Sequence, residues 1–207
     1  MKPYYERNGI KIYHGDCLEI MPQFSENEFE ACVTDPPYPK KYQYLYVGIA
    51  KLLPRLLVRG GSLLAIVPHY AMPVILKEVG ECLKYRWLDS MWQEDGPHPR
   101  MAMGIEIMWK PIVWWVNEAW PMGRGFVRDG FRNKPPNKEH HEWEQERGWA
   151  AFCLGYVPSG RPVIDPLMGS GTLLVEAQRL GYPAVGIDID EQCCETAAER
   201  IDKALDG

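Results

Sequence analysis

The segment PVIDPLMGSGTLLVEAQRLGYPAVGID, residues 162–188, contains the pattern that decides the fold. Apolar runs at 162–164 and 184–187 enclose a glycine-rich stretch and a helical pattern over 172–180. Glycines let the backbone turn sharply and approach a ligand, and a helix start offers free N–H groups to an anion. Asp188 ends the second run, where an acid commonly binds two ribose hydroxyls. The segment predicts half of a nucleoside-binding fold. A plain strand–turn–helix loop is the alternative, and the spacing departs from the GxGxxG of NAD enzymes.

The rest of the chain alternates in the same way between strand patterns and helix patterns. We expect strands at Lys11–Tyr13, Phe29–Thr34 and Leu63–Val67, a strand pair over Ile105–Val116 broken near Pro111, and helices at Leu45–Val58 (stopping before Gly60-Gly61), Ala71–Lys84, Trp143–Tyr156 and Glu191–Leu205. Alternation of this kind predicts an α/β fold with a mostly parallel sheet and helices on both faces.

Length and composition predict one domain over residues 1–207. A net charge of −5 argues against a protein that coats nucleic acid by bulk charge, although a local basic patch stays open. The six cysteines form no C-x-x-C pair and the histidines lack ligand spacing, so we expect no metal. The polar N-terminus resembles no signal peptide and the longest apolar stretch is too short to span a membrane, so we expect a cytoplasmic protein.

A second cluster, Asp35-Pro36-Pro37-Tyr38, follows the apolar run at 29–34. The two prolines fix φ and lack N–H donors, so the Asp35 carboxylate and the Pro36 carbonyl remain as acceptors. An exocyclic amino group, such as N6 of adenine or N4 of cytosine, has two N–H donors that match them. Tyr38 offers a face for stacking on a flat base. An Asp-Pro tight turn is the structural alternative.

Together, Asp35-Pro-Pro-Tyr38 and Asp165-Pro-Leu-Met-Gly-Ser-Gly-Thr172 resemble the S-adenosylmethionine-dependent amino-methyltransferases of DNA, which methylate adenine N6 or cytosine N4. Their order is that of the circularly permuted β group. The resemblance implies a permuted, Rossmann-like class I methyltransferase fold. It also implies a catalytic half at 1–120, a short basic recognition loop at 121–138 and a cofactor-binding half at 139–207.

The resemblance further implies S-adenosylmethionine as the cofactor and assigns residues to it. Asp165, Gly169, Ser170, Gly171 and Thr172 would hold its methionine end, Asp188 its ribose, and Asp16 with Cys17 its adenine. His141–Gln145 stands where the family often has an HPTxKP-like segment, and this match is loose. Leu167 replaces an aromatic residue that often follows Asp-Pro in the family.

The implied activity is direct, in-line methyl transfer to DNA, with Asp35, Pro36, Pro37 and Tyr38 as the catalytic cluster. The aspartate of DPPY, where some members have serine, favours adenine N6 by resemblance. Methylation of cytosine N4, methylation of RNA adenine and an inactive nucleic-acid-binding relative remain alternatives. The target base must flip out of a duplex or arrive single-stranded.

The stretch from Pro121 to Lys138 has five basic residues and one acid, with three glycines and three prolines, and predicts a loop. We expect Arg124, Arg128, Arg132 and Lys134 to contact DNA phosphates. A homodimer is a further expectation, with Trp92, Trp109, Trp114 and Trp115 as its candidate surface. The resemblance also suggests a bacterial or phage-encoded protein, including one from a restriction-modification system.

Overall fold

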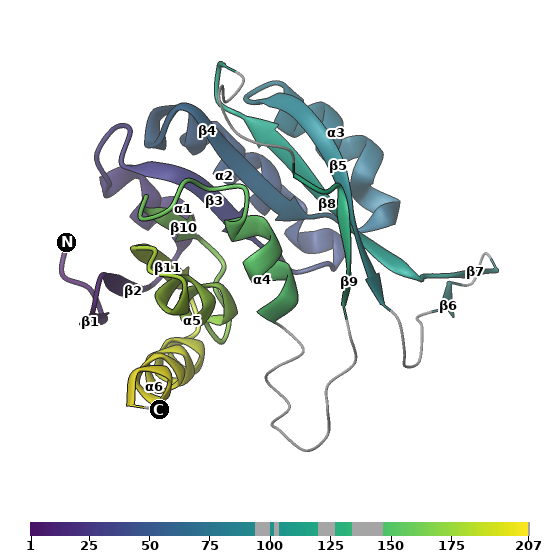
Figure 1. Cartoon of the computed structure of the whole chain (residues 1–207). Coiled ribbons are helices and arrows are strands. Elements are labelled where there is room, and N and C mark those ends of the chain that lie inside the picture. The colour runs from purple at the N-terminus through teal and green to yellow at the C-terminus, as the bar shows by residue number, and fades with distance from the viewer. Residues whose placement is uncertain (94–99, 102–103, 120–126, 134–146, 207) are drawn as a thin grey trace.

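A computed structural model describes residues 1–93, 100–101, 104–119, 127–133 and 147–206. In this part of the chain one nine-stranded sheet has the order β1-β2-β11-β10-β3-β4-β8-β5-β9 (Figure 1). Its strands are β1 (Tyr5–Arg7), β2 (Ile10–His14), β3 (Phe29–Thr34), β4 (Leu57–Ile66), β5 (Lys84–Gln93), β8 (Trp109–Val116), β9 (Gly130–Asn133), β10 (Val163–Asp165) and β11 (Ala184–Asp188). A separate short ladder pairs β6 (Arg100–Met101) with β7 (Ile105–Glu106).

Five neighbouring strands of this sheet run parallel, in the order β2-β11-β10-β3-β4, and β5 runs parallel to β9. β8 is antiparallel to both of its neighbours, and β1 is antiparallel to β2. The mostly parallel α/β sheet expected from the sequence is therefore confirmed. Strands from the end of the chain lie at its centre, since β10 pairs with β3 and β11 pairs with β2. This is the arrangement that a permuted chain order requires.

Helices cover both faces of the sheet (Figure 1). The helices α1 (Cys17–Ile20), α2 (Tyr44–Leu56) and α3 (Met72–Gly80) contribute to one buried cluster, and α4 (Arg147–Leu154), α5 (Thr172–Arg179) and α6 (Glu191–Asp206) contribute to the other. In β4, Leu64 packs into the cluster of α4 to α6, whereas Leu63 packs into the cluster of α1 to α3. Successive side chains of a strand thus pack into two different cores. Because both faces are buried, the strands are apolar along almost their whole length.

Gly60-Gly61 does not end a helix, contrary to the sequence expectation. α2 ends at Leu56, and the two glycines lie inside β4. Gly60 has φ +82°, and a Cβ on Gly61 would lie 2.9 Å from the Glu30 carbonyl oxygen. The glycines are needed because an irregular β4 passes unusually close to β3. Similarly, α3 stops at Gly80 and β5 already begins at Lys84, so the expected helix 71–84 is too long.

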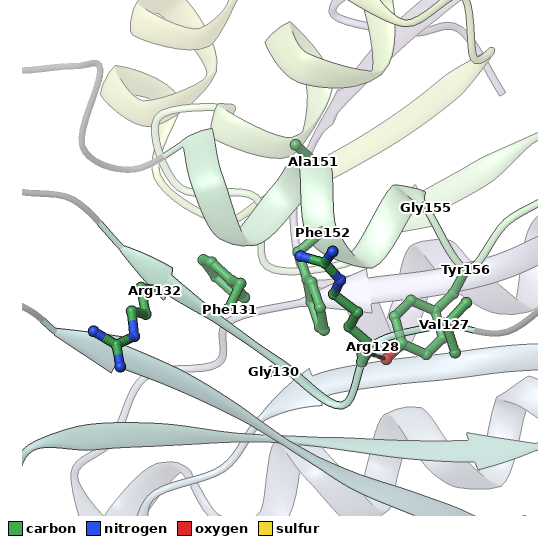
Figure 2. Close-up of a pocket in the computed structure, with 9 residues that line it drawn as sticks. All are labelled: Val127, Arg128, Gly130, Phe131, Arg132, Ala151, Phe152, Gly155 and Tyr156. Atoms are coloured by element: carbon green, nitrogen blue, oxygen red, sulfur yellow. Dashed lines mark hydrogen bonds between the residues drawn. The ribbon is translucent and has the colours of Figure 1, made fainter.

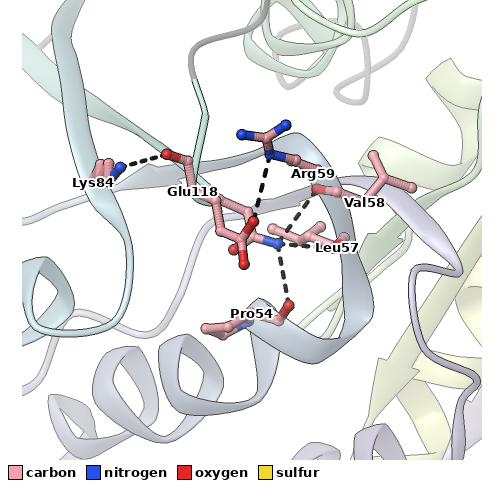
Figure 3. A network of polar contacts seen from close by, with 7 residues as sticks. Pro54, Leu57, Val58, Arg59, Lys84 and Glu118 are labelled. Carbon is pink, nitrogen blue, oxygen red and sulfur yellow. Dashed lines mark hydrogen bonds and ion pairs between the residues drawn. The ribbon is translucent and has the colours of Figure 1, made fainter.

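A network of polar contacts connects the start of β4 with the residues that follow β8 (Figure 3). The Asn117 side-chain amide donates to the carbonyls of Pro54 (3.1 Å) and Leu57 (2.9 Å). Glu118 pairs with Arg59 at 3.6 Å, and both side chains are largely exposed. These contacts lie at the end of the sheet opposite to the carboxyl ends of β3 and β10.

Two further expectations are corrected on the distal strands. Pro111 does not break a strand, because β8 runs through it and its carbonyl accepts from Val67 N at 3.0 Å. The basic stretch 121–138 is not all loop, since residues 130–133 form β9 beside β5. A Cβ at Gly130 would lie 2.8 Å from the Ser90 carbonyl oxygen, so glycine permits this close edge pairing.

The four tryptophans expected at a dimer surface do not share one. Trp115 is fully buried and Trp114 is 6% exposed, because β8 lies inside the sheet and helices cover it. The Trp114 indole instead donates to Ser62 Oγ at 3.0 Å. Trp92 is exposed on β5, and Trp109 is half-buried. Trp114 and Trp115 are therefore core residues, and the sequence could not distinguish them from surface tryptophans.

The packing of α6 against the turn before α5 generates a stability prediction. Gly171 has φ +79°, and a Cβ there would lie 2.6 Å from Ala197 Cβ. We expect Gly171→Ala to lower the free energy of unfolding by about 2–4 kcal/mol, through overpacking and left-handed strain together. Chemical denaturation measures the change. Gly80→Ala is the matched control, because nothing lies within 4 Å of its Cβ position, and its stability should be unchanged or higher. Equal losses in both variants would contradict this packing.

Candidate active site

The predicted site residues converge at the carboxyl ends of four neighbouring strands. β2, β11, β10 and β3 lie side by side and run parallel, so their carboxyl ends reach the same edge of the sheet. Asp188 is in register with His14, and Asp165 is in register with Gly186. In parallel α/β sheets this edge is where ligands bind.

Thr34 and Asp165 join the two halves of this edge. The Thr34 hydroxyl, at the end of β3, donates to Asp165 Oδ1 at 2.8 Å, and the Leu167 backbone N–H donates to the same oxygen at 3.1 Å. Asp165 is only 2% exposed. Burial raises the pKa of Asp165 to about 7, the two hydrogen bonds act in the opposite direction, and Asp35 and Asp188 raise the pKa further. The carboxyl groups of Asp35, directly after β3, and Asp188, at the end of β11, therefore both act on the carboxyl group of Asp165 in β10.

The glycine loop after β10 adopts a conformation that glycine allows at two points. Gly169 has φ +51° and Gly171 has φ +79°. The Gly169 N–H donates to Asp188 Oδ2 at 2.8 Å. A Cβ on Gly169 would meet nothing within 4 Å, so this side of the loop faces open space. The loop thus presents backbone beside a carboxylate, which suits a ligand that approaches the main chain closely.

Asp188 is held in place by backbone donors on both oxygens. Besides Gly169 N–H on Oδ2, Asp190 N–H donates to Oδ1 at 2.9 Å. Each oxygen accepts more than one hydrogen bond, so the oriented carboxylate can still receive two hydroxyls. The half-burial of Asp188 leaves it reachable from this edge.

Arg200 of α6 supports the glycine loop from behind. Its Nη1 donates to the Ser170 carbonyl (2.7 Å), to Ser170 Oγ (2.7 Å) and to Thr172 Oγ1 (3.3 Å). The hydroxyls of Ser170 and Thr172 are thus engaged toward α6. The sequence analysis missed Arg200 because no local pattern links a residue of the last helix to a loop 30 positions earlier.

Asp16 and Cys17 lie next to Asp188 at the start of α1. Asp16 caps the helix, since its Oδ1 accepts from Leu18 N–H at 2.8 Å. Gly15 N–H donates to the Asp188 carbonyl at 2.8 Å, which fixes this turn to β11. Cys17 is 4% exposed, and burial raises the pKa of its thiol to about 12, so it is a neutral packing group.

The DPPY cluster follows β3 directly and is anchored from a neighbouring loop. Asp35 and Tyr38 are half-buried, Pro36 is buried and Pro37 is exposed. The Tyr70 hydroxyl, in η3 (His69–Ala71), donates to the Tyr38 carbonyl. Burial and the Asp35 carboxylate raise the pKa of Tyr38, which keeps its phenol protonated.

Lys110 of β8 completes the surroundings of Tyr38. Its Nζ lies 5.3 Å from the centroid of the Tyr38 ring, within cation–π range. Sequence patterns gave no signal for Lys110 or Tyr70, because only the sheet order brings them to DPPY.

Comparison with known proteins agrees with this geometry. The family profile described as DNA methylase, N6_N4_Mtase, matches residues 153–199. The type II methyltransferase M.ScaI of Streptomyces caespitosus is 21% identical over 97% of this chain and 84% of its own length. M2.DpnII of Streptococcus pneumoniae is 22% identical over 97% of this chain and 92% of its own. These matches agree with the resemblance of the two motifs to DNA amino-methyltransferases.

Solved structures of DNA methyltransferases share the fold of this chain. The PvuII DNA methyltransferase (cytosine-N4-specific) superposes with a TM-score of 0.82 at 15% identity, over 99% of this chain and 93% of that one. M1.HpyAVI in complex with SAM superposes with a TM-score of 0.72 at 18% identity, over 93% and 99%. The permuted class I fold expected from the two motifs is therefore confirmed.

The structure describes only some of the residues expected to contact nucleic acid. Arg128 is exposed just before β9, and Arg132 is exposed within it. Arg124, Lys134 and His141–Gln145 lie outside the described residues. Within the described ranges, no group of three or more His, Cys, Asp or Glu side chains is placed to hold a metal. Among the same residues, every helix is too short or too polar to cross a membrane.

The buried Asp165 carboxyl gives a pH-dependence prediction. Its pKa is about 7 in the folded protein against an ordinary 3.8, so the folded state binds the proton more tightly between about pH 4 and pH 7. This group therefore lowers the free energy of unfolding as the pH rises through that window. In Asp165→Asn that part of the decrease should disappear, whereas Thr34→Val, which removes a hydrogen bond that lowers the Asp165 pKa, should extend the decrease to higher pH. Denaturant titrations across the window measure the slopes, and identical profiles for wild type and Asp165→Asn would contradict the assignment.

Proposed function

We propose that this chain is a site-specific DNA methyltransferase that moves a methyl group from S-adenosylmethionine to N6 of adenine. The observation that carries the proposal is the Thr34–Asp165 hydrogen bond, which sets the DPPY acceptors and the glycine loop side by side at one edge. A methyl donor and an amino acceptor must meet within van der Waals distance for direct transfer. This edge is the place in the described fold where both would fit.

The residues at the loop fit S-adenosylmethionine. The open side of Gly169 and the oriented Asp188 carboxylate suit a nucleoside with two free ribose hydroxyls. Asp16 and Cys17 would lie against the adenine ring, and the stretch Asp165–Thr172 would hold the methionine end. The SAM complex of M1.HpyAVI, a protein of the same fold, supports this choice of ligand.

The protein residues would act on the target base by orientation and by accepting hydrogen bonds. The amino nitrogen of a base is conjugated with its ring, so its lone pair is a poor nucleophile. Asp35 and the Pro36 carbonyl would hold the two N–H groups and favour a tetrahedral nitrogen with an exposed lone pair. Tyr38 would stack on the flipped base. When bound, S-adenosylmethionine supplies an electrophilic methyl group on sulfonium. The methylated nitrogen then sheds a proton, so no tuned general base is needed.

Cytosine N4 is the second candidate target, because two acceptors match either amino group and the PvuII cytosine-N4 methyltransferase superposes well. RNA adenine methylation and an inactive binding protein remain as further alternatives. The type II names and bacterial sources of the relatives support a role in restriction-modification and a cytoplasmic location.

Recognition would rely on few residues. The alignment with M.ScaI spans 257 positions, against 207 residues in this chain, so the relative carries insertions that this chain lacks. We assign recognition to residues 121–138, between a catalytic half at 1–120 and a cofactor-binding half at 139–207. Arg124, Arg128, Arg132 and Lys134 would hold phosphates there. Dimerisation stays a proposal in which Trp92 and Trp109 are the accessible members of the expected surface.

Cofactor binding is the first test of this function. Titration calorimetry should detect S-adenosylmethionine or its demethylated product at micromolar concentration. Asp188→Ala should weaken binding tenfold or more, since it removes charged hydrogen bonds to the ribose. Asp202→Ala is the control, because Asp202 lies on α6 and pairs with Arg7 at the far edge of the sheet. Heat from neither ligand, on folded protein, would overturn the assignment.

Asp35→Ala should lower methyl transfer about a thousandfold or more while the affinity for S-adenosylmethionine stays within about threefold. The reason is that Asp35 acts on the substrate amino group rather than on the cofactor. Tyr38→Ala should cause a milder loss, through the missing stacking face. Transfer of labelled methyl groups to unmethylated DNA, together with calorimetry, separates the two effects. Near-normal turnover of Asp35→Ala would rule out this mechanism.

The product identifies the target base. Nucleoside mass spectrometry of DNA methylated by the wild type should detect N6-methyladenine as the main product. N4-methylcytosine as the main product would make the second candidate the function. Label appearing in RNA alone, under the same conditions, would favour the RNA alternative.

A further inference from the structure

A cavity of about 650 Å³ lies between β9 and α4 (Figure 2). Its volume is within the usual range for sites that take small organic ligands, about 300–1,000 Å³. Phe131 contributes from the strand side, and Phe152 and Tyr156 contribute from α4 and the turn after it. Of its lining residues, only Arg128 and Arg132 have a proposed role above, as phosphate contacts, and its aromatic wall has none.

The wall of the cavity is a fixed aromatic surface. Phe131 and Phe152 stack with ring centroids 4.7 Å apart and planes at 29°, and Tyr156 packs edge-on against Phe152 at 5.3 Å. The Tyr156 hydroxyl lies 2.7 Å from Asp89 Oδ1 and 2.9 Å from the Arg128 carbonyl oxygen. These contacts orient the rings before any ligand arrives, so little conformational entropy is lost on stacking.

The charges along the cavity have one sign. Its lining includes Arg128 and Arg132, both exposed, and no acidic residue. Figure 2 shows the Arg128 side chain extending toward α4 beside Phe152. Asp129, the nearest acid in sequence, is exposed. Its backbone carbonyl accepts a hydrogen bond from Ser90 N–H. Flat rings next to two guanidinium groups suit a ligand that combines a planar ring with a phosphate, which is a nucleotide.

The cavity lies on the same face of the sheet as Tyr38 of the DPPY cluster. Phe131 is in register with Met91, and Met91 is in register with Lys110, whose ammonium group lies over the Tyr38 ring. Tyr38, Phe131 and Phe152 pack against the same buried cluster, on one face of the sheet. Burial, and after it the charges of Asp89 and Asp35, raise the pKa of the Cys153 thiol, next to Phe152. One extended nucleic-acid strand can therefore reach both places.

We propose that this cavity binds a second nucleotide of the DNA strand that carries the target base. Its base would lie against Phe152 and Phe131, and its phosphate would lie at Arg128 and Arg132. The inference rests on the proposed function, because it takes DNA as the substrate. A base held here would fix the neighbouring nucleotide relative to Asp35, and it would give a short recognition segment a means of positioning the strand.

Photocrosslinking of the full chain tests the contact directly. A pool of mixed-sequence duplexes with 5-iodo-deoxyuridine in place of thymidine is irradiated with the wild-type protein, and crosslinked peptides are mapped by mass spectrometry. We expect crosslinks at Phe131, Phe152 or Tyr156. Crosslinks confined to other segments, with DNA binding intact, would overturn the proposal.

Matched variants separate stacking from charge in the same DNA-binding measurement. Phe152→Leu should weaken binding about tenfold with an unchanged salt slope, and Phe131→Leu gives a second variant if Phe152→Leu does not fold. Arg128→Gln should reduce the salt slope by about one. Tyr85→Leu and Arg59→Gln are the controls, since both residues are exposed near the amino-terminal ends of β5 and β4, whereas β9 pairs with the carboxyl end of β5. The affinity of the cavity variants for S-adenosylmethionine should equal that of the wild type.

The outcomes distinguish this inference from the proposed function. If the wild type transfers methyl groups to DNA, but Phe152→Leu and Phe131→Leu bind DNA as tightly as the wild type, the cavity assignment alone is overturned. A folded wild type that binds S-adenosylmethionine but transfers no label to DNA would overturn the proposed function. If that protein also binds no DNA, the cavity assignment fails with it.

Discussion

The hydrogen bond from Thr34 to Asp165 is the contact on which the site depends. It joins two residues 131 positions apart, one directly before DPPY and the other at the start of the glycine loop. Both partners are almost fully buried, so the bond is shielded from water and satisfies a carboxylate oxygen that would otherwise be costly to bury. The same oxygen also accepts a hydrogen bond from Leu167 N–H, so one carboxylate holds the end of β3 and the start of the glycine loop after β10.

The electrostatics of this edge favour a cation. Asp35 and Asp188 both raise the pKa of Asp165, so negative charge is concentrated where three strands end. The proposed cofactor carries a positive sulfonium, and its binding would relieve this repulsion. After transfer the sulfonium becomes a neutral thioether, so the electrostatic part of the attraction would fall when the product must leave.

The sequence predicted the features whose chemistry is local. DPPY, the glycine loop and Asp188 each follow an apolar strand, and the strand–loop junction alone places them at the carboxyl edge. The order of the two motifs also predicted the permuted sheet. The residues that support the loops were not predictable in this way. Arg200 reaches Ser170, and Tyr70 reaches Tyr38, only because of packing between distant elements.

Errors of the sequence analysis came from positions where tertiary structure overrides local preference. Gly60-Gly61 is a typical helix end, but here close strand approach requires it. Trp114 and Trp115 looked like an aromatic surface, but both faces of β8 are covered, and each tryptophan is buried on one of them. Gly130 made the basic stretch look like a loop, although it permits β9 to pair at the sheet edge.

The central position of β10 and β11 has a consequence for synthesis on the ribosome. β2 and β3 are made early, but their parallel partners β11 and β10 belong to the last quarter of the chain. Until those strands emerge, the edges of β2 and β3 that face each other lack their native partners. Unpaired apolar strand edges invite association with other chains, and such long-range pairing is slow. The nascent protein is thus prone to associate with other chains until β10 and β11 insert between β2 and β3 and pair with these edges.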